Sequence, residues 1–281
     1  MSKFRRFRKN RQLVAGSTIG LVIVLLGVFG PMVLGDYADQ DLLLGHKPIG
    51  TEGAFFGTDA LGRDLAARAT FGIRISLLVA IAVTALAVVI GTLIGLIAGY
   101  VRGSVDSLIS LIIDFVWGFP LILVAVLMAA SIGSGLVPVI LAVALVNTVA
   151  IARVVRGEVL GISEKEFVAA SKAGGYSTLR ILTRHIAPNV IPVALVLSSY
   201  YIAVAIIAEA ALSFVGMGAQ PPLPSLGQMV SEGRNYMRLN HWESTIPGII
   251  IFFMVLSVSL VGDGLRDLLD PRLRTALDRT S

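Results

Sequence analysis

The chain has 281 residues, of which 56% are hydrophobic and 15% are charged, whereas a soluble domain has roughly 45–50% apolar and about 25% charged residues. This excess of apolar residues excludes an ordinary soluble domain and indicates a membrane protein. The sequence contains no cysteine and three scattered histidines, which argues against a disulfide scaffold and against a cysteine or histidine metal cluster. The net charge of +5 is interpreted by position, because basic residues report the orientation of a membrane protein.

Six charge-poor segments are expected to cross the bilayer, because a spanning helix needs about 20 apolar residues. The first follows a basic N-terminus and is too long for the apolar region of a signal peptide, so we expect a retained anchor. The third and fourth share a charge-free stretch that a glycine- and serine-containing break divides into a helical hairpin. In chain order, the six spans are expected at 13–34, between 74 and 102, on either side of the break at 131–135 within 115–152, at 189–208 and at 246–261.

The basic residues divide unequally between the two sides of this six-span arrangement. With both ends in the cytoplasm, the inside segments hold 17 of the 23 lysines and arginines, and the outside segments hold the remaining six. The positive-inside rule therefore predicts a multi-pass protein of the plasma membrane with residues 1–12 and 266–281 in the cytoplasm. The external segments are then 35–74 and about 216–244. Because insertion accounts for the surplus charge, we expect no nucleic-acid partner.

The segment between the fourth and fifth spans, about 163–187, predicts two short cytoplasmic helices. Ser163 and Glu166 have the spacing of a capping box, which would begin the first helix. Gly174 and Gly175 would end it, because glycine permits a left-handed C-cap. A second helix would begin near residue 177 and stop before Pro188. The residues alone leave two interpretations open: a helix lying on lipid headgroups, or a docking element for a soluble partner.

Two carboxylates within or at the edge of the spans, Asp114 and Glu209, are functional candidates because ionisable groups are rare at membrane depth. Neither has an evident charged partner in the sequence. A helix break or a water-exposed helix end is the favoured interpretation, and a proton relay is the alternative. Pro120 lies beside Asp114 and permits a kink.

The external segments suggest structure but no metal site. The run Gly57–Asp64 does not have the ligand spacing of an EF-hand, and we expect Thr58 or Asp59 to cap a short helix. The stretch Gln220–Ser225 is too rich in proline to be helical throughout and would form a lid or a partner-facing surface. Near the C-terminus, Arg266 lies three residues after Asp263 and four before Asp270, which is the spacing of ion pairs on one helix face.

The sequence contains no P-loop, no nucleophile elbow and no zincin motif. If the protein couples to an energy source, that source is a partner or an ion gradient. A membrane-bound enzyme is disfavoured, because it would need a catalytic constellation at one interface.

From about residue 56 to residue 272 the motifs resemble those of one family, the C-type permease subunits of dipeptide and oligopeptide ATP-binding-cassette (ABC) importers, a group that also includes nickel importers. Several motifs in the same order make the resemblance specific. The matching segments are, in chain order, Gly57–Asp64, Gly72–Leu77, Asp114 with Phe119-Pro120, Ala152–Gly157, Arg184–Asn189, Ala208–Gly218, Gln220–Gly227 and Gly262–Arg272.

The resemblance implies a type I importer permease, an all-α bundle of six transmembrane helices with a cytoplasmic coupling helix. Partner ATPases dock on that helix, whose family motif contains a glutamate that this chain lacks: Ala169-Ala170-Ser171 stands in its place, and Glu166 lies three positions earlier. The residues implied for ATPase docking are Glu166, Ala169, Ala170, Ser171, Gly175, Arg184, His185 and Pro188.

Two further sets of residues receive roles by the same resemblance. Asp114, Pro120 and Glu209 are candidates for the translocation pathway or its gating. Contact with an external substrate-binding protein is expected from Asp59, Arg63, Asp64, Gln220, Pro221 and Pro222.

The resemblance implies a transport subunit without an ATPase site or cofactor of its own. Its partners would be a homologous B-type permease, two cytoplasmic ABC ATPases that bind ATP and magnesium, an external binding protein and the lipid bilayer. The expected cargo is a dipeptide or oligopeptide; the alternatives are nickel or another small solute carried by the same machinery, or an ion-coupled secondary transporter.

Overall fold

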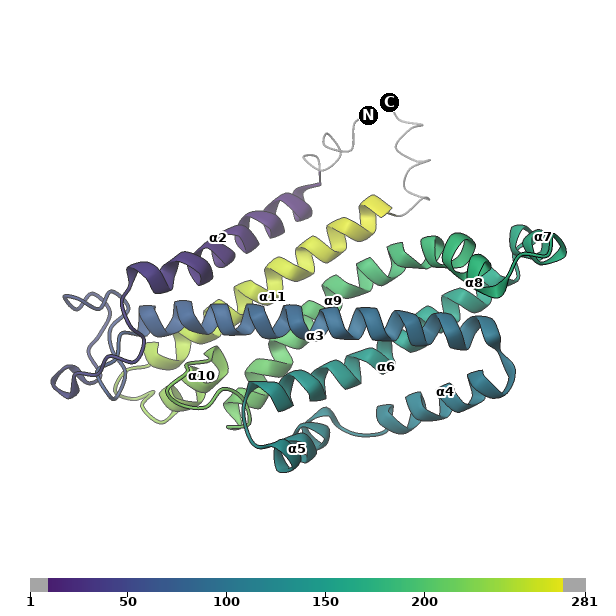
Figure 1. The fold of residues 1–281 in the computed structure, drawn as a ribbon. Helices are drawn as coiled ribbons and strands as arrows, with labels where there is room; N and C mark the ends of the chain where they lie inside the picture. Colours follow the sequence, from purple (N-terminus) through teal and green to yellow (C-terminus); the bar gives the residue numbers. More distant parts are fainter. Residues whose placement is uncertain (1–9, 270–281) are drawn as a thin grey trace.

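The computed structural model describes residues 10–269, except for the side chains of residues 268 and 269, and this part of the chain is an elongated bundle of helices (Figure 1). Five of the described helices are long and apolar enough to cross a membrane, and a sixth span is obtained if one sharply bent helix pair counts as a single crossing. The expected all-α fold is therefore confirmed. The third span is formed by the bent helix pair.

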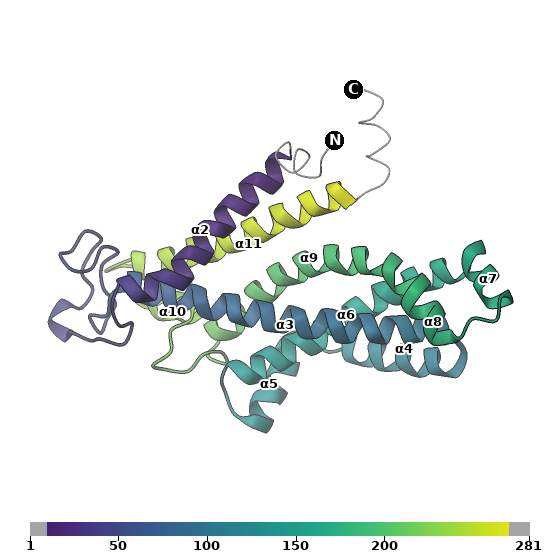
Figure 2. The same ribbon diagram turned by 45° about the horizontal axis from the view of Figure 1, so that its top comes forward.

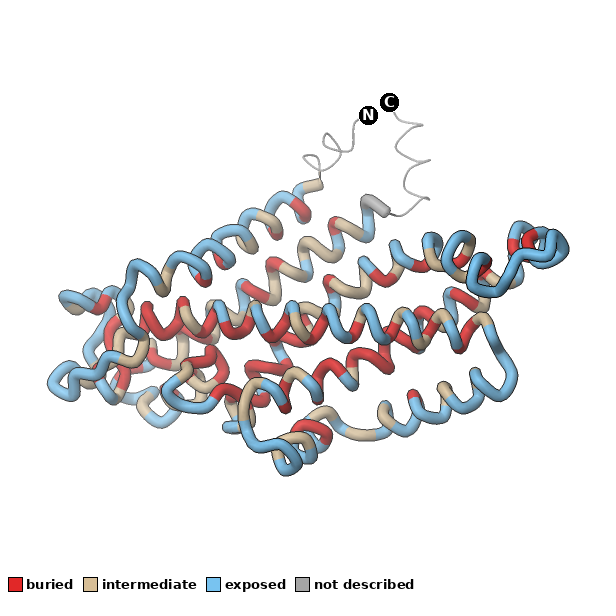
Figure 3. Tube along the Cα trace, in the orientation of Figure 1, coloured by how far each residue is buried: buried red, intermediate tan, exposed pale blue. Residues whose placement is uncertain are grey.

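The first and last spans lie side by side although they are at opposite ends of the chain (Figures 1 and 2). Helix α2 (Arg11–Val33) is the anchor predicted at 13–34, and α11 (Trp242–Leu269) extends the predicted sixth span at both ends. The Ser257 hydroxyl of α11 donates a 2.8 Å hydrogen bond to the Gly16 carbonyl of α2, where glycine lets the two backbones approach. Many side chains of α2 stay exposed in the isolated chain (Figure 3).

Helix α3 (Leu65–Val101) is the centre of the bundle and packs tightly against α6 (Leu136–Ser163). Gly91, Gly95 and Gly99 follow one another at four-residue intervals and face α6. A Cβ atom at Gly95 would lie 2.6 Å from the Cγ1 atom of Val155, so a larger residue there would push the helices apart. This small-residue spacing is a common device for close helix packing in membranes.

The third span is broken. Helix α4 (Gly103–Trp117) and helix α5 (Leu121–Ile132) meet at a bend of 91°, with Pro120 as the N-cap residue of α5. Proline cannot donate the backbone hydrogen bond that a continuous helix would need there. The expected hairpin break is confirmed, since residues 133–135 separate α5 from α6, and the kink that Pro120 permits is present, but α4 begins well before residue 115.

The two short helices between the fourth and fifth spans are present, but their predicted boundaries need correction. Ser163 is the last residue of α6 and not a cap, while α7 (Glu166–Ala173) has Lys165 at its N-cap without a side-chain bond. Ser177 caps α8 (Thr178–Ile181) as expected. Pro188 does not end the helical segment as predicted, because proline is tolerated in the first turn of a helix, here α9. A π-helical turn, η2 (Leu182–Ile186), leads directly into α9 (Ala187–Phe214).

The opposite end of the bundle carries a folded cap that we call the platform, residues 34–64 together with residues 215–241. It contains the 3₁₀ turn η1 (Leu42–Leu44) and helix α10 (Leu226–Arg234), which Ser225 caps. The helix predicted to start at Thr58 or Asp59 is not formed. Instead, an isolated bridge between Thr58 and Asp64 closes a loop, and Asp64 caps α3 by accepting a hydrogen bond from the Ala66 amide.

Candidate functional site

The α7–α8 tip projects beyond the bundle at the end opposite the platform (Figures 1 and 2). Gly175 has a φ of 74°, a conformation that favours glycine. The amide of Tyr176 donates to the Ser171 carbonyl over 3.2 Å and closes the end of α7. Val168 and Ile181 are buried against the end of α6. The tip is therefore fixed to α6 and α9 and would move with them.

The outer surface of the tip combines apolar and basic groups. Phe167 and Leu179 are 41% and 70% exposed, and the Arg180 guanidinium lies 4.5 Å from the centre of the Tyr176 ring. Ser171 is buried and donates a hydrogen bond to a carbonyl within α7, so it supports the tip from inside. His185 is partly buried. The other docking candidates are exposed, namely Glu166, Ala169, Ala170, Gly175, Arg184 and Pro188.

Asp114 has a charged partner that the sequence did not suggest. The Arg153 guanidinium of α6 donates to the Asp114 carboxylate of α4 over 2.5 Å, and the same guanidinium lies 4.9 Å from the centre of the Trp117 ring. In the α4 sequence, Asp114 lies three residues before Trp117, where the helix ends ahead of the bend at Pro120. Asp114 therefore helps to hold the end of α4 on α6, next to the point at which the third span changes direction.

A second ion pair fixes the same two helices nearer the α7 end. The Arg156 guanidinium donates two hydrogen bonds to the Asp106 carboxylate, at 2.5 and 2.7 Å. Asp106 and Asp114 are eight residues apart on α4, which places them on nearly the same face of the helix. Two arginines of α6 thus form ion pairs with α4 at two positions. We call these two ion pairs the α4–α6 clasp.

Glu209 is fully buried in α9 with no exposed surface. The Ser76 hydroxyl of α3 donates to one carboxylate oxygen over 2.8 Å, and the Ser213 hydroxyl donates to the other over 2.7 Å. Among the described residues it makes no ion pair, in keeping with the sequence. Glu209 therefore joins α9 to α3 just below the platform through hydroxyl groups and not through a charge.

The platform is joined to the bundle by a buried charge network. Asp59 is 5% exposed and accepts hydrogen bonds from the guanidinium groups of Arg63 and Arg68. Arg68, in the first turns of α3, also donates to Glu232 of α10 over 2.9 Å. The Asn240 side chain adds a link by donating to carbonyl oxygens of the 34–64 segment. The two external segments are thus one folded unit.

The ionisation of the platform carboxylates follows from these contacts. Burial by itself would raise the pKa of Asp59, but the charges of Arg68 and Arg63 and the Arg63 amide outweigh burial and hold that pKa below its ordinary value. Burial raises the pKa of Asp64, because the amides of Ala66 and Ala67 offset only part of the desolvation. Asp59 is therefore a carboxylate at neutral pH and a structural partner of the two arginines.

The structure separates the six residues predicted to contact a binding protein into two groups. Asp59, Arg63 and Asp64 lie inside the platform, where their side chains hold its loop and the start of α3. Gln220, Pro221 and Pro222 are exposed or partly exposed in the loop before α10. Only the second group offers a free surface in this chain, and contact with a partner stays a prediction for both.

Several functional candidates escape reasoning from the sequence. In the sequence, Arg68 and Glu232 are charged residues without a visible partner, and nothing connects Arg153 with Asp114 or Arg156 with Asp106. Tertiary packing brings these pairs together across 39 to 164 residues. The four-residue spacing of Gly91, Gly95 and Gly99 was a readable signal that would have predicted the α3–α6 contact.

A bundle of candidate membrane spans with an exposed tip at one end and a folded cap at the other is the architecture of a multi-pass membrane protein. Residues 91–275 match the family described as binding-protein-dependent transport system inner membrane component, and residues 3–48 match the N-terminal transmembrane domain of oligopeptide transport permease C. The chain belongs to this permease family and is a multi-pass component of the membrane.

Curated relatives cover nearly the whole chain. The oligopeptide transport system permease protein OppC of Bacillus subtilis is 37% identical over 96% of this chain and 88% of its own length. OppC of Escherichia coli K12 is 38% identical over 96% and 90%. The dipeptide transport system permease protein DppC of Alkalihalophilus pseudofirmus is 37% identical over 97% and 90%.

Among solved structures, the chain resembles one from the inward-facing MetNI methionine ABC transporter, with a TM-score of 0.60 and 20% identity. The match covers 71% of this chain and 95% of that chain. This likeness supports the fold, that of a type I ABC importer permease, which the motifs had implied.

Proposed function

We propose that this chain forms half of a translocation pathway for short peptides, delivered by an external substrate-binding protein and moved by ATP hydrolysis in partner subunits. The relatives named as oligopeptide and dipeptide permeases, at 37–38% identity along nearly the whole chain, support the choice of cargo. The partners are a related permease, two ATPases that bind ATP and magnesium, and the binding protein. The chain itself supplies no ATPase site.

The observation that carries this proposal is the α7–α8 tip. An interfacial helix needs an apolar face turned to lipid, whereas the tip buries Val168 and Ile181 in its own base and presents Phe167 and Leu179 together with basic side chains. Such a mixed surface suits a groove on a soluble protein. We assign it to the ATPase, with the basic residue count placing the tip in the cytoplasm.

The mechanism follows from how the tip is attached. Because the tip is fixed to α6 and continues into α9, a displacement of the docked ATPase would tilt both helices together. The α4–α6 clasp would carry this motion to α4 and to the bend before α5. Rigid-body rocking of a permease bundle around a central pathway is an established mode of alternating access.

Reconstitution tests the proposal. The chain is co-expressed with a partner permease and two ATPase subunits and purified as a complex. The complex is placed in proteoliposomes whose lumen holds the binding protein and radiolabelled trialanine. We expect ATP added outside to export the peptide from the lumen, which is transport in the import direction for inside-out complexes. Trialanine that stays in the lumen while Ni²⁺ moves would support the nickel alternative. Proton-driven movement without ATPase subunits would support a secondary transporter.

A further inference from the structure

Several charged residues of the spanning helices have partners among the described residues, whereas others, including Arg74 of α3 and Asp267 of α11, make no ion pair there. Those of the clasp are paired with one another, and Glu209 is satisfied by serines. Three others, Glu158 of α6 with Asp263 and Arg266 of α11, make no ion pair or side-chain hydrogen bond with any described residue. The helix-face pair predicted between Asp263 and Arg266 is thus not formed, and the pair predicted between Arg266 and Asp270 lies outside the described residues. All three residues are exposed and lie on α6 and α11 towards the α7 end of the bundle.

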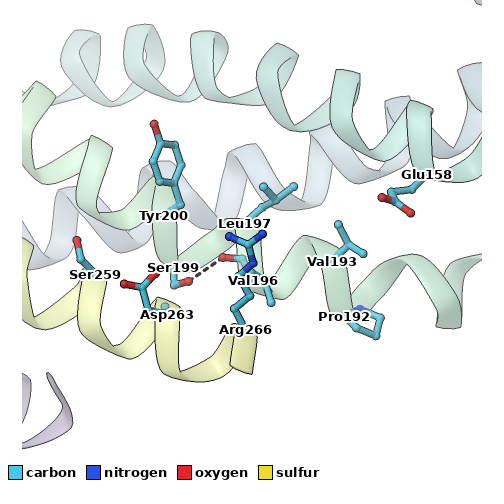
Figure 4. Close-up of a pocket in the computed structure, with 11 residues that line it drawn as sticks. Glu158, Pro192, Val193, Val196, Leu197, Ser199, Tyr200, Ser259, Asp263 and Arg266 are labelled. Carbon is cyan, nitrogen blue, oxygen red and sulfur yellow. Dashed lines mark hydrogen bonds between the residues drawn. The ribbon is translucent and has the colours of Figure 1, made fainter. Parts of the chain in front are cut away.

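All three of these charges line one cavity. It has a volume of about 810 Å³ and lies between α6, α9 and α11, towards the α7 end of the bundle (Figure 4). Ligand pockets in proteins occupy about 300–1,000 Å³, so the space suits a small solute. Figure 4 draws Arg266 and Asp263 of α11 together with Val196, Leu197 and Ser199 of α9 among the residues that line this cavity.

The cavity arises where two helices separate. At Ser199 and Gly262 helices α9 and α11 are in close contact, since a Cβ atom at Gly262 would lie 2.7 Å from the Ser199 hydroxyl oxygen. Beyond this contact the helices diverge towards the α7 end (Figure 2). The cavity therefore lies mainly on the α7 side of Ser199–Gly262, the side that the proposed orientation places in the cytoplasm.

The lining is complementary to a peptide with free termini. A short peptide carries an ammonium group at one end and a carboxylate at the other, and a tripeptide spans at most about 10 Å. The cavity offers a guanidinium, two carboxylates and the Ser199 hydroxyl around an apolar bed of α9 side chains. A lipid tail would need an apolar lining throughout, and a single ion would not need both signs of charge.

We infer that this cavity is a transit site for a short peptide, in which Arg266 binds the peptide carboxylate and Asp263 binds its ammonium group, while Glu158 lies at the other end of the cavity. The inference rests on the proposed function and adds to it the chemistry by which this chain holds its cargo. Guanidinium–carboxylate contacts are among the strongest hydrogen bonds available to a protein, so Arg266 would contribute most of the selectivity for a free C-terminus.

Photocrosslinking in the assembled, nucleotide-free transporter tests this site without the binding protein, because the cavity opens to the cytoplasmic side. The probe is a tripeptide with a central benzoylphenylalanine, prepared with free termini, with a C-terminal amide or with an N-terminal acetyl group. We expect it to label residues 193–200 or 259–266, and Arg266→Gln to lower labelling by the free-acid probe about tenfold, as expected for losing a hydrogen bond to a charged group. Labelling by the amide should not change.

Asp263→Asn should show the complementary pattern, with weaker labelling by the probe that has a free amino terminus and no change for the acetylated probe. The matched control is Asp267→Asn on the same helix, since Asp267 does not line the cavity. Equal losses for capped and free probes would overturn the assignment. Labelling confined to the partner permease would show that the cavity is filled by a partner helix, and would also overturn it.

The two proposals fail in different ways. A complex that moves trialanine with ATP but is not labelled in α9 or α11 refutes the transit site and leaves the proposed function standing. A complex that moves no peptide refutes the proposed function, whatever the crosslinking shows.

Discussion

Asp114 on α4 and Arg153 on α6 form an ion pair over 39 residues of sequence, close to the point at which the third span bends by 91°. The Arg153 guanidinium also stacks near Trp117, the last residue of α4. The pair joins a helix that leads into the bend to the helix that leads into the α7–α8 tip. The ion pair gives Asp114 a structural role, so a proton relay is not needed to explain a carboxylate at this position.

We predict that Asp114→Asn lowers the ATP-driven transport rate about threefold, since an ion pair with partly exposed side chains contributes up to about 1 kcal/mol. ATP hydrolysis should persist, because the tip still docks. The double variant Asp114→Arg with Arg153→Asp should recover part of the loss. The measurement is trialanine flux per ATP hydrolysed, and a double variant no better than the single one would argue against the pair.

Variants of Glu209 test whether its carboxyl group has a structural role or couples transport to an ion. We expect Glu209→Ala to destabilise the protein by about 1–3 kcal/mol, because the buried hydroxyls of Ser76 and Ser213 lose their acceptor. Glu209→Gln keeps a carbonyl acceptor and should retain most transport. Thermal unfolding and flux at several pH values check both outcomes. Loss of transport in Glu209→Gln, with its fold intact, would instead support an ion-coupled mechanism.

The platform should weaken in acid through Asp59. Its pKa in the folded protein is below the ordinary value of 3.8, so its stabilising contribution is complete above that value and is lost as the pH falls through the folded pKa. Asp59→Asn should remove this pH dependence and cost about 3 kcal/mol at neutral pH, because it leaves buried Arg68 without its Asp59 partner.

Tryptophan fluorescence reports this transition. Trp242 packs on the cluster of Leu65 and Met229 below the platform. The second tryptophan is removed by Trp117→Phe, and acid titrations are then compared with and without the Asp59→Asn substitution. The two proteins should give different midpoints. An acid transition that is the same in both would show that another group controls it.

The docking surface can be tested at one exposed position of the tip. We expect Ala170→Glu to leave membrane insertion and platform folding intact, while a charge on the contact surface lowers ATPase binding and abolishes coupled transport. Ala170→Ser is the matched control and should behave as the unaltered chain. Co-purification of the ATPase and trialanine flux are the readouts, and unaltered flux in Ala170→Glu would contradict the assignment.

Local patterns in the sequence were sufficient for the features that depend on neighbouring residues. The apolar runs indicated the spans, because hydrocarbon accepts only long apolar helices there. The glycines at 174 and 175 indicated the bend of the tip, where a positive φ is needed at Gly175. The capping box at Ser163 was misleading, because α6 continues through that residue and its packing outweighs a local capping preference.

The pairing of charges and the shape of the cavity required the tertiary structure. No local pattern states that Arg153 meets Asp114, that Arg68 links Asp59 to Glu232, or that Glu209 faces Ser76, since each contact joins separate helices or loops. The same holds for Glu158, Asp263 and Arg266, which converge on one cavity only because α9 and α11 diverge beyond Ser199–Gly262. Sequence by itself determined that this chain crosses a membrane repeatedly and belongs among transport permeases; helix packing decided which of its charges are structural and which remain available for cargo.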